Sequence, residues 1–182
     1  RLAVKRGDAG RALASAAHAV RLRFSTPFTD HAFMETESAL AHPPDADGVV
    51  FVRTGEQNVY DGRRYAAATL GLPTEKVRVV SAYVGGAYGG KEDQTVQHLA
   101  ALLAWLANRP VKCTLGREES TRVHVKRHAM SIDVELGCDG RGMLVGLRER
   151  ITADTGAYAS LGGPVLHRAV THAGGPYACA NV

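Results

Sequence analysis

The sequence predicts an α+β fold in which a mixed β-sheet is packed against helices. The chain has 182 residues, of which 45% are hydrophobic and 22% charged, so it can bury a core for one domain or two small ones. Its 20 glycines and 7 prolines follow no period, which excludes collagen-like and low-complexity chains. Predicted strands do not alternate regularly with predicted helices, and this favours a mixed sheet over a doubly wound parallel one.

The first half of the chain is predicted to hold two helices and four strands. Asp8 is placed to cap a short helix over residues 9–17, because its carboxylate accepts from free N–H groups of the first turn. Gly71 and Pro73 end a second helix over residues 60–70. Alternating or valine-rich runs predict strands over residues 19–25, 33–41, 49–53 and 76–84.

The second half begins with the strongest helical pattern of the chain, over residues 94–107, which we expect Asp93 to cap. This helix is apolar nearly all round, so we expect it to be buried. Pro164 suits the first turn of a last helix over residues 164–173. Strands are predicted over residues 111–115, 131–136 and 144–152, the last two forming a hairpin around residues 138–140.

Composition excludes several classes of function. A net charge of +4 spread over the chain and only 6% aromatic residues argue against a nucleic-acid-binding protein. The three cysteines share no CxxC spacing, which argues against a disulfide framework, a zinc finger or an iron–sulfur cluster within the chain and suits a reducing cytoplasm. No run approaches 18 apolar residues, so no membrane span is expected. Because the chain opens at Arg1, we expect a piece of a longer polypeptide.

A glycine-rich loop over residues 85–90 is the strongest functional signal. Four of its six residues are glycine, so its backbone can approach a ligand closely, and a helix start after it would favour phosphates or other oxygen-rich anions. The loop matches a phosphate-binding P-loop up to Lys91, but Glu92 stands where that motif needs a hydroxyl for Mg²⁺. A phosphate- or nucleotide-binding enzyme and a structural or assembly module without chemistry therefore remain alternatives.

Longer motifs resemble one known family. The run VGGAYGGKEDQTVQ over residues 84–97 and the upstream HAFMETESALA over residues 31–41 resemble the molybdenum-binding subunit of xanthine dehydrogenases and related molybdenum hydroxylases. The similarity extends through GLPTEKVRVVS, REES, KRHAM and ADTGAYASLGGPVLHRAVTHAGGPY to nearly the whole chain. It is greatest to bacterial purine-hydroxylating members of the selenium-dependent type. The resemblance implies that residues 1–182 are an N-terminal portion of the molybdenum-cofactor-binding domain.

The resemblance also assigns roles to individual residues. Gln57 resembles the glutamine that hydrogen-bonds an oxo ligand of molybdenum, Glu92 the carboxylate that binds the purine, and Arg168 the arginine that faces it across the substrate. A guanidinium at that place would stabilise negative charge developing on the ring. The loop that passes beside the metal corresponds to Gly86, Ala87, Tyr88 and Gly89, with Tyr88 where most relatives have phenylalanine.

The implied cofactor is molybdenum bound to molybdopterin in a dinucleotide form, and the implied substrate is a purine or related N-heterocycle. The 2Fe-2S and FAD groups and the general base would lie in other domains or subunits. From the residues alone, His31, Glu35 and Glu37 have the look of metal ligands, but their apolar neighbours favour a packed structural element. The basic run over residues 122–128 is interpreted as solvated charge or as a contact with other domains.

Overall fold

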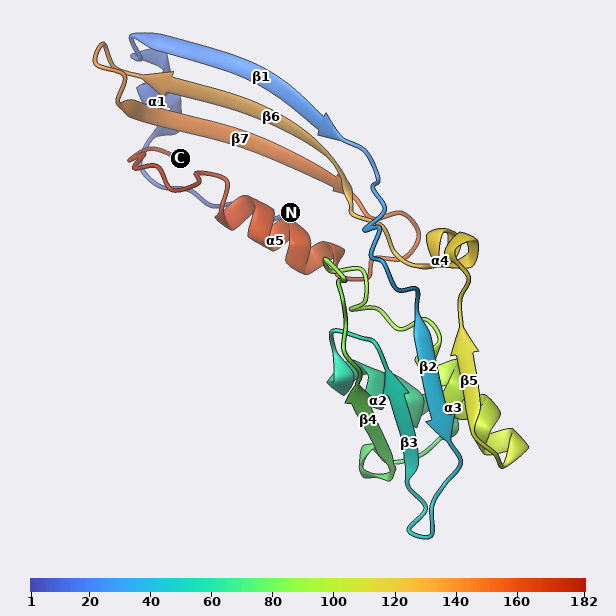
Figure 1. The fold of residues 1–182 in the computed structure, drawn as a ribbon. Helices are drawn as coiled ribbons and strands as arrows, with labels where there is room; N and C mark the ends of the chain where they lie inside the picture. The colour runs from blue at the N-terminus through green and yellow to red at the C-terminus, as the bar shows by residue number, and fades with distance from the viewer. The chain divides into compact units, whose positions relative to one another are not determined.

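The computed structural model describes all 182 residues and divides them into two units (Figure 1). Unit 1 combines Arg1–Thr29 with His128–Val182, and unit 2 is the intervening segment Asp30–Arg127. The chain therefore leaves unit 1 after its first strand, completes unit 2, and returns to add the remaining strands. No helix is long and apolar enough to cross a membrane.

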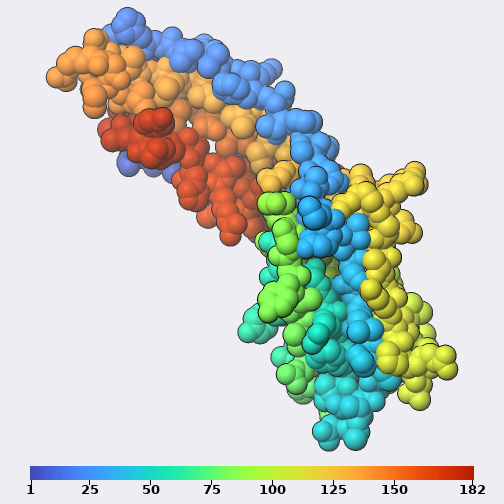
Figure 2. Space-filling view, viewed as in Figure 1, coloured from blue at the N-terminus to red at the C-terminus, as the bar shows by residue number.

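Unit 1 is built on a three-stranded antiparallel sheet in the order β1-β6-β7, formed by β1 (His18–Thr26), β6 (Ala129–Cys138) and β7 (Leu144–Asp154). The predicted hairpin is confirmed, since Asp139 accepts at one carboxylate oxygen from the N–H groups of Arg141 and Met143 in the turn. Every residue of β1 is exposed, and this strand follows the surface of the unit (Figure 2).

Two helices, α1 (Ala9–Ala14) and α5 (Gly162–Thr171), pack against β7. The Asp8 carboxylate accepts from the N–H of Arg11, so the predicted cap of α1 is confirmed, although the helix ends earlier than expected. Leu13 of α1 is buried against the sheet at Gly137 and Gly146. A Cβ at either glycine would lie 3.1 Å from the Leu13 side chain, so their lack of side chains lets the helix sit close.

Unit 2 contains a four-stranded mixed sheet in the order β4-β3-β2-β5. Its strands are β2 (Ser38–His42), β3 (Val50–Thr54), β4 (Val77–Ser81) and β5 (Val111–Thr114), and only β3 and β4 run parallel. The long helices α2 (Val59–Leu70) and α3 (Gln97–Ala107) pack together, and the chain adds η1 (Thr74–Lys76) and α4 (Arg117–Val123). The predicted α+β class with a mixed sheet is confirmed.

The hydrophobic core lies in unit 2, between its sheet and these two helices. Small and β-branched side chains dominate it, which lets helix and sheet approach closely. Its buried members are Ala39, Ala41, Val50, Val52, Ala66, Ala67, Val77, Val96, Ala100, Ala101 and Ala104. At the end of α2, Gly71 takes a left-handed conformation with φ of 67°, as its place after the helix predicts.

Three predictions about unit 2 are wrong. Helix α3 begins at Gln97 with Val96 as its N-cap residue, so Asp93 lies too early in the chain to cap it, and no side chain does. The Gln97 side chain accepts from the N–H groups of Thr95 and Val96, which precede the helix. The helix is also not buried all round: its alanines face the core, whereas Leu99, Leu103 and Leu106 are 46% to 71% exposed. The strand expected from residue 33 starts only at Ser38, because the preceding residues turn to support a loop.

Candidate functional site

The glycine loop follows β4 in unit 2, as predicted. Tyr88 and Gly89 have φ of 55° and 90°, and Gly90 closes a turn by donating its N–H to Ala87 O at 2.8 Å. The backbone N–H groups of residues 86–89 have no acceptor within the chain. Four successive donors therefore remain for an oxygen-rich ligand. Helix α3 starts only at Gln97, so its dipole does not act at this loop as the sequence suggested.

A carboxylate fixes the start of the loop. Glu35 Oε1 accepts from the N–H of Gly85 at 2.6 Å, and Glu35 Oε2 lies 3.7 Å from Lys91 Nζ. Hydrogen bonds from its own backbone N–H and from Gly85, together with the charge of Lys91, lower the pKa of the Glu35 carboxyl. A Cβ at Gly85 would displace the Glu35 carboxylate from its place against the loop backbone.

Lys91 is turned into the protein. Only 3% of it is exposed, and its ammonium lies 4.6 Å from the centroid of the Phe33 ring as well as near Glu35. A P-loop lysine has to reach the phosphates of a nucleotide, whereas this one points at internal partners. The geometry therefore counts against the nucleotide-binding alternative.

Gln57 is brought to the same loop. Its N–H donates to Lys91 O at 3.0 Å, and its side-chain Oε1 accepts from the N–H of Lys91 at 3.2 Å. The adjacent Asn58 caps α2 by accepting from the N–H of Asp61, which fixes the backbone at this point. Since the amide oxygen of Gln57 is occupied, its Nε2 remains the group that can donate to a ligand.

Glu56 is a buried acid that the sequence analysis did not single out. It is 3% exposed, accepts at Oε2 from Gln97 Nε2 at 3.4 Å, and burial raises the pKa of its carboxyl. Both of its carboxylate oxygens would lie 2.6 Å from a Cβ at Gly62, so this glycine in α2 makes room for it. A glycine inside an otherwise regular helix is the signal that could have found this contact.

A buried polar cluster lies around His124, which corrects the interpretation of the basic run. His124 Nδ1 lies 2.6 Å from Ser120 O, a carbonyl, and therefore carries a hydrogen; Nε2 lies 3.6 Å from Asp30 Oδ2. Its ring is 5.0 Å from that of Phe33, between centroids. His124 is thus a packed residue and not solvated charge. Arg127, at the end of the run, donates to Tyr88 O at 3.4 Å and so also contacts the loop.

Two of the residues first considered as metal ligands, His31 and Glu35, support the loop, whereas Glu37 lies near His124, with its Oε1 3.5 Å from His124 Nδ1. His31 and Phe33 pack where a Cβ of Gly90 would be, at 2.7 and 2.8 Å from their rings. Burial, followed by the charges of Arg127 and His124, lowers the pKa of His31. No group of three or more His, Cys, Asp or Glu side chains is arranged to hold a metal ion. What the loop itself offers a ligand is its backbone N–H groups.

The remaining predicted residues are divided between the units. Glu92 is half-buried in unit 2, directly after Lys91, while Arg168 is exposed on α5 of unit 1. Gln57, Glu92 and the loop are thus gathered in unit 2. That Glu92 and Arg168 face each other stays a prediction.

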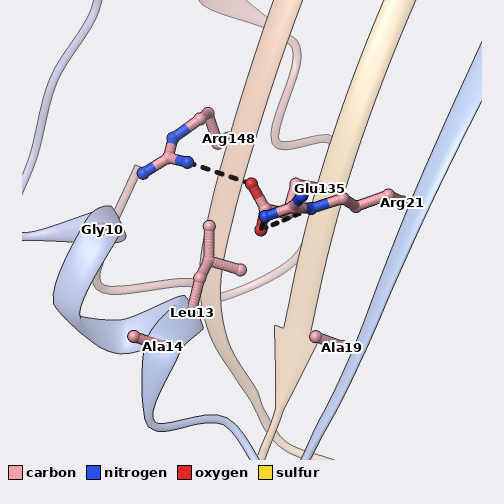
Figure 3. A pocket seen from close by; sticks show the side chains of 7 residues that line it. All are labelled: Gly10, Leu13, Ala14, Ala19, Arg21, Glu135 and Arg148. Atoms are coloured by element: carbon pink, nitrogen blue, oxygen red, sulfur yellow. Dashed lines mark hydrogen bonds and ion pairs between the residues drawn. The ribbon is translucent and has the colours of Figure 1, made fainter.

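A cavity in unit 1 lies apart from these predicted residues. It has a volume of about 390 Å³ and is lined by α1 and the sheet (Figure 3). Its charges are mutually paired, because Glu135 bonds Arg21 Nη2 at 2.7 Å and Arg148 Nη1 at 3.0 Å. None of the residues predicted from the sequence to bind cofactor or substrate lines it.

Comparison with known proteins places the chain in a family. The family model for the molybdopterin cofactor-binding domain matches residues 1–182. The chain is 43% identical over 159 residues to a probable xanthine dehydrogenase subunit of Bacillus subtilis (strain 168), covering 87% of this chain and 21% of that relative. It is 38% identical over 176 residues to the nicotinate dehydrogenase large molybdopterin subunit of Eubacterium barkeri, covering 97% of this chain and 41% of that relative.

The fold is shared with a solved structure, the aldehyde oxidoreductase from Desulfovibrio gigas. The TM-score is 0.90 at 24% identity over 98% of this chain and 20% of that one, which establishes the fold alone. The chain spans about a fifth of the Bacillus relative and two fifths of the Eubacterium relative. On the family match over its full length, this chain belongs to the molybdopterin cofactor-binding domain family.

Proposed function

We propose that this domain forms one wall of the cofactor and substrate site of a molybdenum hydroxylase acting on purines or a related N-heterocycle. The observation that carries the proposal is the row of four backbone N–H groups at residues 86–89, which have no acceptor in the chain and lie on a loop held by the side chains of Glu35 and Gln57. Such a row suits the oxygen atoms of a molybdenum–pterin cofactor. The cofactor would be bound in a dinucleotide form.

The chain's own residues have separable tasks toward that cofactor. Gly86, Ala87, Tyr88 and Gly89 would donate their N–H groups, and Gln57 would donate from Nε2 while its oxygen stays bonded to Lys91. When bound, the cofactor supplies two-electron oxidation of a substrate C–H bond. The electrons would pass to 2Fe-2S and FAD groups in other domains or subunits, in a cytoplasmic enzyme.

Glu92 and Arg168 would select the substrate. A carboxylate at Glu92 can accept from ring N–H groups, and a guanidinium at Arg168 can stabilise negative charge that develops on the ring during hydroxylation. Two relatives named for xanthine and nicotinate dehydrogenases support an N-heterocycle. An aldehyde needs neither contact.

Steady-state kinetics of the molybdenum subunit that contains this domain test the assignment. We expect Arg168→Met to lower kcat on xanthine or hypoxanthine by about 10² to 10³, because removing a donor aimed at developing charge costs that much. Glu92→Val should mainly raise KM, since its hydrogen bonds exist in the ground state. Oxidation of benzaldehyde should be unchanged or faster in both variants. A parent protein that prefers benzaldehyde, or variants with intact turnover of xanthine, hypoxanthine and nicotinate, would contradict the substrate class.

A further inference from the structure

The two ends of the glycine loop are joined through side chains. Glu35 accepts from the N–H of Gly85, the first residue of the loop, and its second oxygen lies 3.7 Å from the ammonium of Lys91, which directly follows the last residue, Gly90. Glu35 therefore links the first residue of the loop to the residue that follows its last one. We call this pair of side chains, Glu35 and Lys91, the clasp.

The clasp also holds Gln57. The backbone of Lys91 both donates to Gln57 Oε1 and accepts from Gln57 N–H, at 3.2 and 3.0 Å. A shift of Lys91 would therefore move the end of the loop and the Gln57 amide together. Lys91 thus interacts with the Glu35 carboxylate through its ammonium and with Gln57 through its backbone.

The charge on Lys91 is deeply buried, and this makes its partner necessary. A buried lysine is rare unless it is paired, because an ammonium loses its hydration in the interior. Glu35 is the one carboxylate in salt-bridge range of Lys91 Nζ, and the Phe33 ring covers another side of the ammonium. An apolar side chain could fill this space at less electrostatic cost. The presence of a charged pair here therefore indicates a role beyond packing.

We propose that Glu35 and Lys91 are positioning residues that hold the glycine loop closed, so that the N–H groups of residues 86–89 and Nε2 of Gln57 point to a common ligand. This inference rests on the proposed function for the identity of that ligand, the molybdenum–pterin cofactor. The closure of the loop is a property of the protein that is measurable without it.

Three variants of the molybdenum subunit test the clasp. Glu35→Gln keeps an acceptor for the N–H of Gly85 but removes the charge, and Lys91→Met removes the ammonium while keeping much of its volume. The double variant E35Q/K91M leaves no unpaired buried charge. Arg64→Met is a matched control, because it removes the Arg64–Asp61 ion pair on the surface of the same unit.

Hydrogen exchange, bound molybdenum and melting temperature are measured for each variant. In both single variants we expect the amides of Gly85, Gly90 and Lys91 to exchange about tenfold faster while those of β3 are unchanged. Molybdenum per subunit should fall about 10- to 100-fold, as is usual when groups supporting a ligand site are removed. The double variant should regain melting temperature but not molybdenum. Arg64→Met should have the same amide exchange rates, molybdenum content and melting temperature as the parent protein.

Three outcomes would overturn the proposed role of the clasp. The first is unchanged exchange of the loop amides in Lys91→Met, and the second is recovery of molybdenum together with melting temperature in the double variant, which would show an effect through stability alone. The third is faster exchange throughout β3 in the single variants, which would reduce the pair to a structural role. If the parent protein holds no molybdenum, the proposed function fails, and the exchange rates still decide whether the clasp closes the loop.

Discussion

The two units of this chain support their surfaces in different ways. In unit 2, strands β2 and β3 are backed by a continuous core of alanines and valines, and the loop beyond β4 is held by side chains from several segments. In unit 1, β1 is exposed along its whole length, and its Val20, Leu22 and Phe24 are 45% to 51% exposed. A ligand site needs groups held by rigid neighbours. The difference shows that unit 2 gives the glycine loop the firmer support.

Two glycines with similar backbone conformations, one in each unit, allow the difference between the units to be tested by substitution. Gly89 in the loop and Gly142 in the β6–β7 turn have φ of 90° and 82°, and a Cβ at either would meet no atom closer than 3.9 Å. Valine at either position should therefore cost a similar backbone strain, about 1 to 3 kcal/mol. Only Gly89→Val should abolish cofactor binding and activity, because it reshapes the row of N–H donors.

Chemical denaturation and molybdenum analysis of the two variants provide the readout. Comparable losses of unfolding free energy, with molybdenum lost only from Gly89→Val, would match the account. Normal molybdenum content and turnover in Gly89→Val would show that no ligand approaches this backbone.

The sequence predicted the locally encoded parts of both units well. The Asp8 cap, the Gly71 helix end and the hairpin around Asp139 depend on residues within a few positions of each other, and each is confirmed. The late start of α3 was missed because Asp93 is of a residue type that favours an N-cap, whereas the helix starts four residues later, after Val96, with no side-chain cap.

The support of the loop could not be predicted, because it depends on contacts between distant segments. Glu35 bonds Gly85 across 50 positions, and Gln57 bonds Lys91 across 34. The alternation of apolar and polar residues between residues 33 and 41 predicts a strand. This pattern is the same whether or not the Glu35 side chain bonds a loop, so it carries no information on that contact. The motif resemblance assigned roles to Gln57 and the loop but none to Lys91 or His124.

One acid in each unit, the buried Glu56 and the half-buried Glu149, extends the comparison to a smaller effect. Burial raises the pKa of Glu56 in unit 2 and of Glu149 in unit 1. A carboxyl whose folded-state pKa is raised stabilises the fold fully below its unfolded pKa of about 4.5, and that contribution is lost as pH rises through the folded pKa.

Glu56→Gln should therefore raise the unfolding free energy at pH 8 by about 1 kcal/mol and flatten its pH dependence above pH 4.5. Glu149→Gln should raise the unfolding free energy by a smaller amount, because Glu149 is less buried than Glu56. Urea unfolding from pH 4 to pH 8 measures both. A loss of stability in Glu56→Gln at high pH would mean that the ionised carboxylate is the form the fold requires.

The most direct test of the N–H groups at residues 86–89 measures their hydrogen exchange in two preparations of the molybdenum subunit. One is purified with its cofactor, and the other comes from a host unable to make molybdopterin. Backbone amides of residues 86–89 have no acceptor within the chain, so they should exchange rapidly in the cofactor-free protein. With cofactor bound, these amides should become protected, while those of the β6–β7 turn at Gly142 should exchange at the same rate in both preparations. Equal exchange of residues 86–89 in the two preparations would contradict the claim that this loop forms the wall of the cofactor site.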